Sequence, residues 1–454
     1  MIDTHCHLDL LEKEHFEEAI NDESLEYLIT IGFDKKTCEN ALNIASKYDK
    51  VYCAVGFHPN DVADITEKDI LWLEDLAKSG AKVKAIGEIG LDYYRSKDLK
   101  DKQIEYFNIQ LELAKKLGLP VVIHSRDAEE DTIKVLESHQ NVGGVLHCFS
   151  GSLEFMRKGV ELGFYISYSG NITFKNAQSL REVVSKTPTY RLLIETDSPW
   201  LAPVPHRGEK NKPSFIWHTA KVMSELIPNS SLEDIDRTTS ANAKLCFNLG
   251  FDKNEDTITY VINNKLYINP TNKCNLHCRF CERERDRNFM VKGYWVWTRR
   301  DPSADDIIRE IPNPEAYDEI VFCGYGEPTL RMDVIKEVSS YIKSKSPNTK
   351  VRVDTNGLYL AFGKKEDLEN LRGLVDTFSI SLNAPDENTY NEVCRPPYKN
   401  AFSLLIEFIK TVKELGFEVI TTAVTYPGVD IDATEKLALE LGTKFRKREW
   451  EVLG

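Results

Sequence analysis

The sequence contains no long apolar run, although 41% of its 454 residues are hydrophobic and 29% are charged. Its first residues, MIDTHCHLDL, include no basic segment followed by an apolar stretch, so we expect neither a signal peptide nor a membrane span. Cysteine is thinly spread, with ten residues and one closely spaced group. Secreted disulfide scaffolds are short and rich in cysteine, so we predict a reducing, cytoplasmic setting.

An excess of positive charge is also absent. Lysine and arginine number 58 against 72 aspartates and glutamates, which leaves a net charge of −14. Proteins that grip phosphate backbones without sequence preference usually present a basic surface. The charge balance therefore argues against bulk DNA as the natural substrate, although net charge also serves solubility.

Short apolar segments alternate with amphipathic ones through the first half of the chain. Helical patterns occupy residues 101–117 and 153–163, and a last one covers residues 232–249. Eight strands joined by helices within about 250 residues predict an α/β fold, an N-terminal (β/α)8 TIM barrel. The predicted strands are residues 1–5, 27–31, 51–55, 83–88, 120–124, 144–147, 164–168 and 191–197.

A polar segment at residues 250–257 is followed by a second alternation of strands and helices. We predict a first domain at residues 1–252, a linker at 253–257 and a second domain at 258–454. A short hairpin over residues 257–268, turned at Asn263 and Asn264, would begin that domain. Six strands favour a partial, open (β/α)6 barrel. They are residues 265–269, 319–323, 350–354, 377–382, 418–424 and 444–452.

Nine of the ten histidines precede the linker, and only His277 follows it. Several lie with carboxylates at predicted strand ends, where barrel enzymes carry their chemistry. A lone histidine there is more often structural, but six coordinated placements favour two divalent ions, Zn, Mg or Mn. Glu88 would bridge ions about 3.5–4 Å apart. The predicted ligands are His5, His7, Glu88, His124, His147 and Asp197.

These motifs resemble those of the TatD family of metal-dependent hydrolases. The stretches DTHCHLD, GFHPN, IGEIGLDYY, HSRDA, HCFSGS and ETDSPWLAP occur in order within residues 1–250. The resemblance implies that His5, His7, Glu88 and Asp197 hold one metal, and that Glu88, His124 and His147 hold the other. It also implies catalytic roles for Glu88 and Asp197, with Asp197 as general base, and hydrolysis of nucleic-acid phosphodiesters, usually as a DNase.

The loop PVPHRGEKNKP departs from the family pattern. Glu209 stands where a basic residue is usual and Lys212 where an acidic one is usual. An amide, an ester or a small phosphoester therefore stays open as an alternative substrate. Arg126 and Arg207 are candidates to hold a phosphate, and His58 to contact substrate, although structural roles fit each of them equally well.

Three cysteines, Cys274, Cys278 and Cys281, lie in CNLHCRFC after the first strand of the second domain. Three closely spaced thiolates suit an iron–sulfur cluster. Zinc would need a fourth ligand, for which Cys323 and Cys394 are open alternatives, although both are also typical small buried hydrophobes.

With the aromatic Phe280, this loop resembles that of the radical S-adenosylmethionine (SAM) superfamily. The resemblance implies a [4Fe–4S] cluster, reductive cleavage of SAM to a 5′-deoxyadenosyl radical, and an external electron donor such as flavodoxin or ferredoxin. The substrate of the radical is not indicated. Further implied SAM contacts are Gly324, Gly326 and Glu327 in GYGEP, and Asp354, Asn356 and Ser381 at two later strand ends.

Residues 279–300 combine seven arginines and lysines with Phe289, Tyr294, Trp295 and Trp297. Such a mixture binds single-stranded nucleic acid by charge and stacking. The interpretation that we favour is a lid whose aromatics pack on the partial barrel. The leading hypothesis for the whole chain is a bifunctional enzyme, whose partners are nucleic acid or a small phosphoester and an electron donor, with no membrane.

Overall fold

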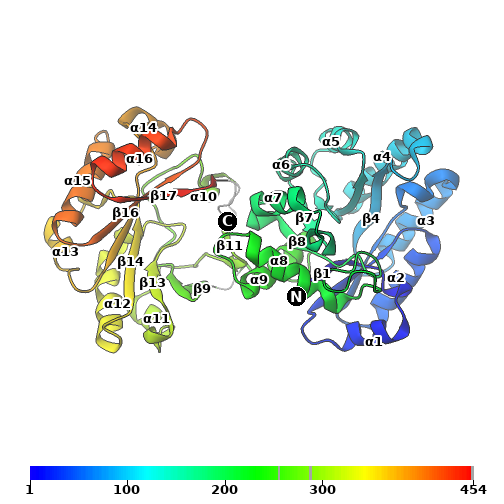
Figure 1. Ribbon diagram of the computed structural model, residues 1–454, viewed down its shortest axis with the longest axis horizontal. Helices are drawn as coiled ribbons and strands as arrows, with labels where there is room; N and C mark the ends of the chain where they lie inside the picture. The colour runs from blue at the N-terminus through cyan, green and yellow to red at the C-terminus, as the bar shows by residue number, and fades with distance from the viewer. Residues whose placement is uncertain (254–255, 286–288, 451–454) are drawn as a thin grey trace. The chain divides into compact units, whose positions relative to one another are not determined.

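The computed structural model describes residues 1–253, 256–285 and 289–450. The chain divides into two compact units, Met1–Phe251 and Asp252–Gly454 (Figure 1). Residues 254–255 of the predicted linker, Arg287 of the basic stretch and residues 451–452 of the last predicted strand lie outside the described residues. Among the helices of the described ranges, none has both the length and the apolarity needed to cross a membrane.

The first unit is a barrel of eight parallel strands in sequence order. It closes because the chain after β8 pairs with β1: the Asp197 N–H donates to His5 O at 2.9 Å, and the His7 N–H donates to Ser198 O at 2.8 Å. The predicted TIM barrel is confirmed. Its strands are β1 (Ile2–Cys6), β2 (Tyr27–Gly32), β3 (Val51–Val55), β4 (Val83–Asp92), β5 (Val121–Arg126), β6 (Gly144–Leu146), β7 (Tyr165–Tyr168) and β8 (Leu192–Ile194).

Local sequence signals begin and end the surrounding helices. Asp34 and Thr37 form a capping box at the start of α2, and Gly118, with φ of +65°, ends α4. Phe247, just after α9, packs with Ile2 and Leu193, so the start of the barrel strands is plugged and their other end is free for chemistry. The helices are α1 (Lys13–Asn21), α2 (Lys35–Lys47), α3 (Glu67–Lys78), α4 (Lys100–Leu117), α5 (Glu129–Ser138), α6 (Leu153–Glu161), α7 (Gln178–Lys186), α8 (Ile216–Leu226) and α9 (Leu232–Cys246).

Two strand ends of the first unit differ from the prediction by three residues or more. β4 continues four residues beyond Glu88 to Asp92, with a register shift against β5 between Ile86 and Ile89. β8 ends at Ile194, and Asp197 follows in a left-handed backbone conformation with φ of +55°. Alternation of apolar and polar residues does not report such local irregularities, so the sequence placed both carboxylates at regular strand ends.

The second unit contains six parallel strands in the order β10-β13-β14-β15-β16-β17, with β9 antiparallel at the β10 edge. The predicted partial barrel is confirmed. Asn263 and Asn264, with φ of +48° and +58°, form the two-residue turn between β9 and β10. The strands are β9 (Thr259–Ile262), β10 (Lys265–Ile268), β13 (Glu319–Phe322), β14 (Lys350–Thr355), β15 (Thr377–Ser381), β16 (Glu418–Val424) and β17 (Lys444–Arg448).

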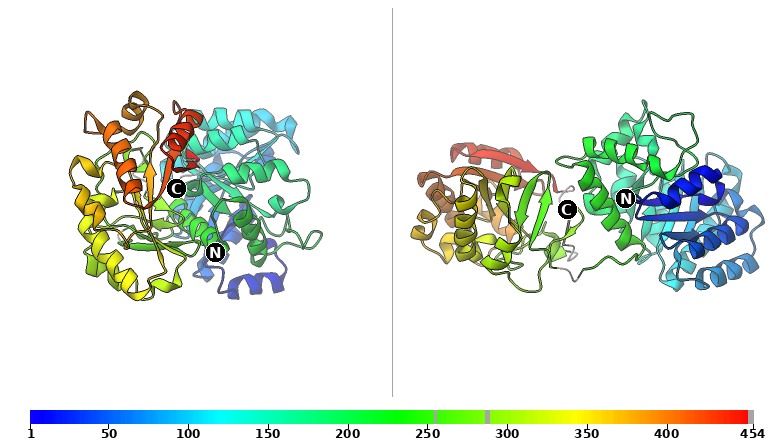
Figure 2. Two further views of the ribbon diagram at one scale, coloured as in Figure 1. Left: turned by 60° about the vertical axis from the view of Figure 1, so that its left-hand side comes forward. Right: turned by 90° about the horizontal axis from the view of Figure 1, so that it is seen from below.

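One face of this second sheet packs on helices. Phe322, Val353, Phe378 and Ile380 join a buried cluster with apolar residues of α12 and α15, and Figure 2 shows these helices stacked along the sheet. Because side chains alternate along a strand, Asp354, Ser379 and Ser381 point to the opposite face, which we call the open face. The helices are α10 (Glu282–Arg285), α11 (Ala304–Arg309), α12 (Met332–Lys345), α13 (Lys365–Glu369), α14 (Glu387–Cys394), α15 (Ala401–Glu414) and α16 (Ile431–Glu440).

Candidate active sites

The six residues predicted as metal ligands lie together in the barrel. His5 and His7, from β1 and the residue after it, approach each other with 3.2 Å between their Nε2 atoms. Each Nε2 lies 3.7 Å from Oδ1 of Asp197, and Nε2 of His5 lies 3.6 Å from Oε2 of Glu88. The donor atoms of His5, His7 and Glu88 all lie close enough together to hold one divalent cation, and Asp197, which follows β8, faces both histidines.

A second set of donors surrounds the other oxygen of Glu88. Oε1 lies 2.9 Å from Nδ1 of His124 and 2.8 Å from Nε2 of His147. Those two nitrogens are 3.3 Å apart. Glu88 therefore presents one oxygen to each group of histidines.

The hydrogen bonds of the imidazoles show which ring nitrogens are free to bind an ion. Nδ1 of His7 lies 3.2 Å from the carbonyl oxygen of Ile31. A carbonyl only accepts, so Nδ1 carries the proton and Nε2 keeps a lone pair. His58 differs, because the Asn60 N–H donates to its Nδ1 at 3.1 Å. Its Nε2 therefore carries the proton and faces Glu88 at 3.5 Å, so His58 orients that carboxylate.

Two buried carboxylates that the sequence analysis did not single out hold the outer nitrogens of the second histidine pair. Oδ2 of Asp92 lies 3.3 Å from Nε2 of His124, and Oε1 of Glu195 lies 3.3 Å from Nδ1 of His147. Such partners select the tautomer and the ring orientation of a metal-binding histidine. The spacing of Asp92, four residues after Glu88 in the same strand, could have identified it, because alternation turns both side chains to one side. Glu195 follows the end of β8, so alternation does not place it.

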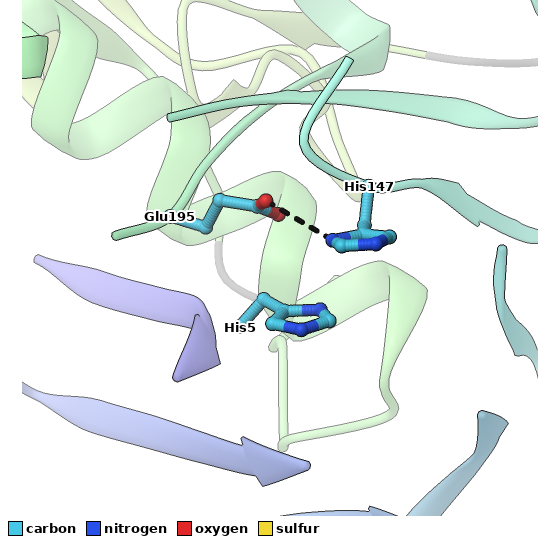
Figure 3. Close-up of side chains that lie close together, drawn as sticks. All are labelled: His5, His147 and Glu195. Atoms are coloured by element: carbon cyan, nitrogen blue, oxygen red, sulfur yellow. Dashed lines mark hydrogen bonds and ion pairs between the residues drawn. The ribbon is translucent and has the colours of Figure 1, made fainter. Parts of the chain in front are cut away.

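Figure 3 shows the rings of His5 and His147 lying face to face, with Glu195 beside His147. The ring centroids are 4.0 Å apart and the planes differ by 10°. Burial and the neighbouring His147 hold the pKa of His5 well below its usual value. Burial would also lower the pKa of His147, but the carboxylates of Glu88 and Glu195 outweigh it and raise that pKa well above the usual value. The carboxylates thus create a strong demand for positive charge.

Burial alone would raise the pKa of Glu88 as well. The imidazoles of His147, His58 and His124 hold it well below its usual range instead, so Glu88 is ionised at neutral pH. An anionic Glu88, a neutral His5 and the inward-facing ring nitrogens of His7, His124 and His147 form a donor set that fits divalent cations, with a bound ion displacing the inward protons of His124 and His147.

Aromatic and cationic side chains lie at the end of β5 and on the loops that follow other barrel strands. The Trp200 ring packs edge-on against His7, with 4.9 Å between centroids, yet 48% of Trp200 is exposed. The guanidinium of Arg126 lies 3.9 Å from the ring centre of Tyr94, and that of Arg207 lies 3.8 Å from the ring centre of Phe174. Both arginines are held on flat rings with no carboxylate partner among the described residues.

The two departures from the family pattern form ion pairs. Glu209 lies 3.1 Å from Nδ1 of His206, and Nζ of Lys212 lies 2.7 Å from Oε2 of Glu18 on α1. Glu209 therefore makes a contact within the loop, and Lys212 links the loop to α1 of the barrel.

In the second unit, the three clustered cysteines lie in the loop between β10 and α10. The loop docks on the end of α14, where the Arg279 N–H donates to Val393 O at 2.9 Å. Burial raises the pKa of Cys274 to about 12. The thiol of Cys394 contacts that of Cys278 and, together with burial, raises the pKa of Cys278 well above its usual value. Of the two remote thiols considered as a fourth ligand, Cys394 is thus next to the loop, whereas Cys323 is close to Asp354 on the open face.

The GYGEP segment is tied to the cysteine loop through its glycines and Glu327. A Cβ atom at Gly326 would overlap the carbonyl oxygens of Thr271 and Lys273, and one at Gly324 would overlap Asn269. Only glycine permits this approach. The Glu327 N–H donates to Lys273 O at 2.7 Å, which joins the segment to the residue before Cys274.

The side chain of Glu327 is itself fully engaged by the protein. Oε1 accepts from the hydroxyls of Thr329 and Thr355, each at 2.6 Å, and Oε2 accepts from the Asn356 N–H at 2.7 Å. Burial raises the pKa of Glu327 above its usual value. This carboxylate thus positions the strand end that carries Asn356.

The other predicted SAM contacts also lie near the cysteine loop or on the open face. Nδ2 of Asn356 donates to Oδ1 of Asn275 at 2.6 Å. Oδ1 of Asp354 lies 3.3 Å from Nε of Arg352, and the Ser381 hydroxyl accepts from Arg448 at 3.3 Å. The Phe280 ring lies 6.0 Å from that of Tyr426.

The aromatics of the basic stretch pack on one another and on the sheet. The Phe289 ring lies 4.4 Å from that of Trp297 and 5.5 Å from that of Tyr325, while Tyr294 packs against Tyr260 at 5.5 Å. Two cations are paired within the same unit: Arg299 with Asp256 at 3.1 Å and Arg300 with Asp306 at 2.9 Å. This packing agrees with the interpretation of the stretch as a lid whose aromatic residues pack on the partial barrel.

A closed barrel with converging histidines and carboxylates defines the class of metal-dependent hydrolases, here joined to a partial barrel with a cysteine loop. Residues 2–248 match the family model of TatD-related DNases, and residues 268–441 match that of the radical SAM superfamily. The chain belongs to the TatD family, and its second unit is a radical SAM domain.

Relatives of the barrel cover only the first half of this chain. It is 42% identical to the uncharacterized metal-dependent hydrolase YabD of Bacillus subtilis, over 55% of this chain and 99% of that protein. It is 35% identical to the uncharacterized metal-dependent hydrolase YcfH of Escherichia coli K12, over 55% of this chain and 96% of that protein. The crystal structure of the TatD homolog YJJV from E. coli K12 aligns with a TM-score of 0.52 at 32% identity, over 55% of this chain and 98% of that one.

Family membership implies divalent metal ions in the barrel. The radical SAM domain implies an iron–sulfur cluster, SAM and an external reductant.

Proposed function

We propose that the barrel hydrolyses phosphodiester bonds with a two-metal site and that the second domain cleaves SAM reductively to act on a further molecule. The observation that carries the first part is the division of Glu88, whose Oε2 faces His5 and whose Oε1 faces His124 and His147. In this proposal His5, His7, Glu88 and Asp197 hold one ion, and Glu88, His124 and His147 hold the other.

Divalent ions bound there supply Lewis-acid stabilisation of the charge that develops on phosphoryl oxygens. Asp197, whose Oδ1 faces His5 and His7, accepts a proton from the water that attacks phosphorus. The bond from phosphorus to the leaving oxygen breaks, and that oxygen takes up a proton. His58 and Glu195 keep Glu88 and His147 oriented.

Nucleic acid is the substrate class that the surrounding side chains favour. Arg126 and Arg207 are cations without a described carboxylate partner and suit phosphate. Trp200, half-exposed beside His7, offers a flat ring to an unstacked base. A second candidate, a small phosphoester, ester or amide, is favoured by the net charge of −14 and by the acidic Glu209.

The barrel assay compares single-stranded and duplex oligonucleotides with generic phosphoester, ester and amide substrates, each with Zn²⁺, Mg²⁺ or Mn²⁺. Phosphodiester cleavage that disappears in the double variant His124→Ala, His147→Ala supports the proposal. Turnover confined to amides or esters would contradict it. His139→Ala is the matched control, because His139 lies at the end of α5, away from the predicted metal ligands, and its ring contacts Val135 O of that helix.

For the second domain, we propose that Cys274, Cys278 and Cys281 hold a [4Fe–4S] cluster and that Phe280, Gly324, Gly326, Glu327, Asp354, Asn356 and Ser381 surround SAM. A cluster held by these cysteines would supply one electron to SAM, and the chemistry so provided would be reductive cleavage of the sulfur–C5′ bond to methionine and a 5′-deoxyadenosyl radical, with an external donor replacing the electron. Glu327 acts by positioning, because both of its oxygens accept hydrogen bonds from the protein.

The test is anaerobic reconstitution with iron and sulfide, followed by dithionite and SAM, with detection of 5′-deoxyadenosine. Wild-type protein is expected to bind about four irons and to form this product, and Cys278→Ala to do neither. A wild-type protein that takes up zinc and no iron would overturn this part. Incubation with cell extract and SAM, read by mass spectrometry, then identifies the molecule that the radical attacks.

A further inference from the structure

Two arginines of the last strand of the second unit, β17, project from one face of the sheet. Arg446 donates to the hydroxyl of Ser379 at 3.4 Å, and Arg448 donates to that of Ser381 at 3.3 Å. The neighbours of these serines, Phe378 and Ile380, pack on the helices. Arg446 and Arg448 therefore lie on the open face.

The carboxylates of the open face are already paired with other cations. Nε of Arg352 lies 3.3 Å from Oδ1 of Asp354 and 3.6 Å from Oε1 of Glu319. Nζ of Lys265 lies 2.9 Å from Oε2 of Glu319. Arg352 and Lys265 thus balance Asp354 and Glu319, and among the described residues no carboxylate forms an ion pair with Arg446 or Arg448.

The environment of Arg448 makes an unpaired charge costly. Its Nε is shielded from solvent and has no hydrogen-bond partner, and burial lowers its pKa below the usual value. Arg448 as a whole is half-buried and Arg446 is exposed, and a partly buried guanidinium is stabilised more by an anion than by a neutral hydroxyl. The serines orient the two arginines but do not neutralise them.

The arginine pair also lies near the residues proposed to surround SAM. Arg448 contacts Ser381 directly, and the charges of Asp354 and of Arg448 influence each other. Arg448 also lies close to Cys278 of the cysteine loop. The pair therefore borders the space between the cysteine loop and the strand end of Asp354.

We propose that Arg446 and Arg448 form a binding site for an oxyanion, a carboxylate or a phosphate, of a molecule held on the open face. The planar fork of a guanidinium matches such groups with two parallel hydrogen bonds. The oxyanion belongs either to SAM, as its carboxylate, or to the molecule that the radical attacks. This inference rests on the proposed SAM site.

The test uses the full chain, reconstituted anaerobically, as wild type, Arg446→Gln, Arg448→Gln and Arg448→Lys. Lys447→Gln is the matched control, because Lys447 projects from the other face of β17 and pairs with Glu449 at 2.9 Å. Equilibrium dialysis measures the binding of SAM, of decarboxylated SAM and, with SAM present, of inorganic phosphate. Iron content and cluster absorbance show whether each variant is folded.

If the site takes the SAM carboxylate, Arg448→Gln weakens SAM binding about 10- to 100-fold and leaves decarboxylated SAM unchanged. If it takes the oxyanion of the attacked molecule, SAM binding stays constant and phosphate binding weakens by at least about 10-fold in either glutamine variant. In both cases Arg448→Lys keeps the charge but loses the planar fork, so its affinity falls between those of wild type and Arg448→Gln.

Equal affinities for all three probes in wild type and glutamine variants overturn the inference, as does a wild type that binds no phosphate while its SAM affinity is insensitive to Arg448. A wild type that binds SAM in those cases leaves the proposed radical function standing. A wild-type protein that binds neither the cluster nor SAM would contradict the proposed radical SAM function itself.

Discussion

Asp92 and His124 face each other across 3.3 Å, from carboxylate Oδ2 to Nε2 of the ring. Three further hydrogen-bond donors hold this carboxylate, among them the Arg95 N–H at 2.8 Å and Nδ2 of Asn60 at 3.2 Å. Burial would raise the pKa of Asp92, but these bonds and that from His124 lower it, so the group stays ionised. It therefore fixes the proton of His124 on Nε2 and directs Nδ1 towards Glu88.

Asp92→Asn is expected to weaken metal binding at the His124 position about 10- to 100-fold, because the amide no longer selects one tautomer of the ring. Titration with Zn²⁺ or Mn²⁺, followed by calorimetry, measures the loss. Asp98→Asn, at an exposed aspartate of the segment that follows β4, is the control. Unchanged affinity in Asp92→Asn would show that the carboxylate has no part in orienting the ligand.

Metal removal is expected to separate the two activities. Treating the protein with a chelator, or introducing His124→Ala with His147→Ala, should lower hydrolysis at least about 100-fold, because the ions contribute several kcal/mol of charge stabilisation. SAM cleavage in the double variant should stay near the wild-type level. Cys278→Ala should do the reverse. Parallel assays of hydrolysis and of 5′-deoxyadenosine on the same preparations decide this, and loss of both activities in either variant contradicts two independent sites.

Glu327→Gln is expected to destabilise the second unit by about 1–3 kcal/mol, because an amide cannot accept at both of its ends. Either the Asn356 N–H or the hydroxyls of Thr329 and Thr355 would lose an acceptor. SAM binding should weaken with it, since Asn356 follows the strand end that Glu327 holds. Urea unfolding and equilibrium dialysis measure the two effects.

The matched control for that change is Glu337→Gln, at an exposed position of α12. Glu327→Gln with wild-type stability and SAM affinity would mean that these hydrogen bonds are dispensable.

Asp376 links the stability of the second unit to pH. Its Oδ2 accepts from Lys343 at 2.7 Å and from the Val351 N–H at 2.8 Å. Burial raises the pKa of Asp376, but these partners outweigh it, and the net pKa is lower than usual. The carboxylate therefore adds stability above its unfolded pKa, near 4, and that stability is lost as pH falls through the folded pKa.

Asp376→Asn is expected to lower the unfolding free energy by about 1–3 kcal/mol at pH 7, with the difference shrinking below about pH 4. Hydrogen exchange of the β14 and β15 amides across this range is the measurement. Asp333→Asn, at a side chain that is 80% exposed, serves as control. A difference between Asp376→Asn and wild type that grows towards low pH would contradict the sign.

Much of the fold was predictable because it depends on short-range patterns. Asn263 and Asn264 predicted a tight turn, and both adopt the left-handed conformation that such a turn needs. The strands of both barrels lie within a few residues of the alternating segments. The extension of β4 to Asp92 and the early end of β8 were not predictable, because register shifts depend on the neighbouring strand.

The sequence alone determined which residue types stand at the barrel strand ends and in the cysteine loop, and hence the two families. Only the tertiary structure decided how they are oriented. Long-range contacts choose tautomers and hydrogen-bond partners, so the roles of Asp92, Glu195 and Glu327 emerge from contacts between strands. The charge balance of the open face also depends on long-range contacts. In the sequence, Arg446 and Arg448 are ordinary basic residues, and only the structure shows that Asp354 pairs with Arg352 and leaves them without an anion.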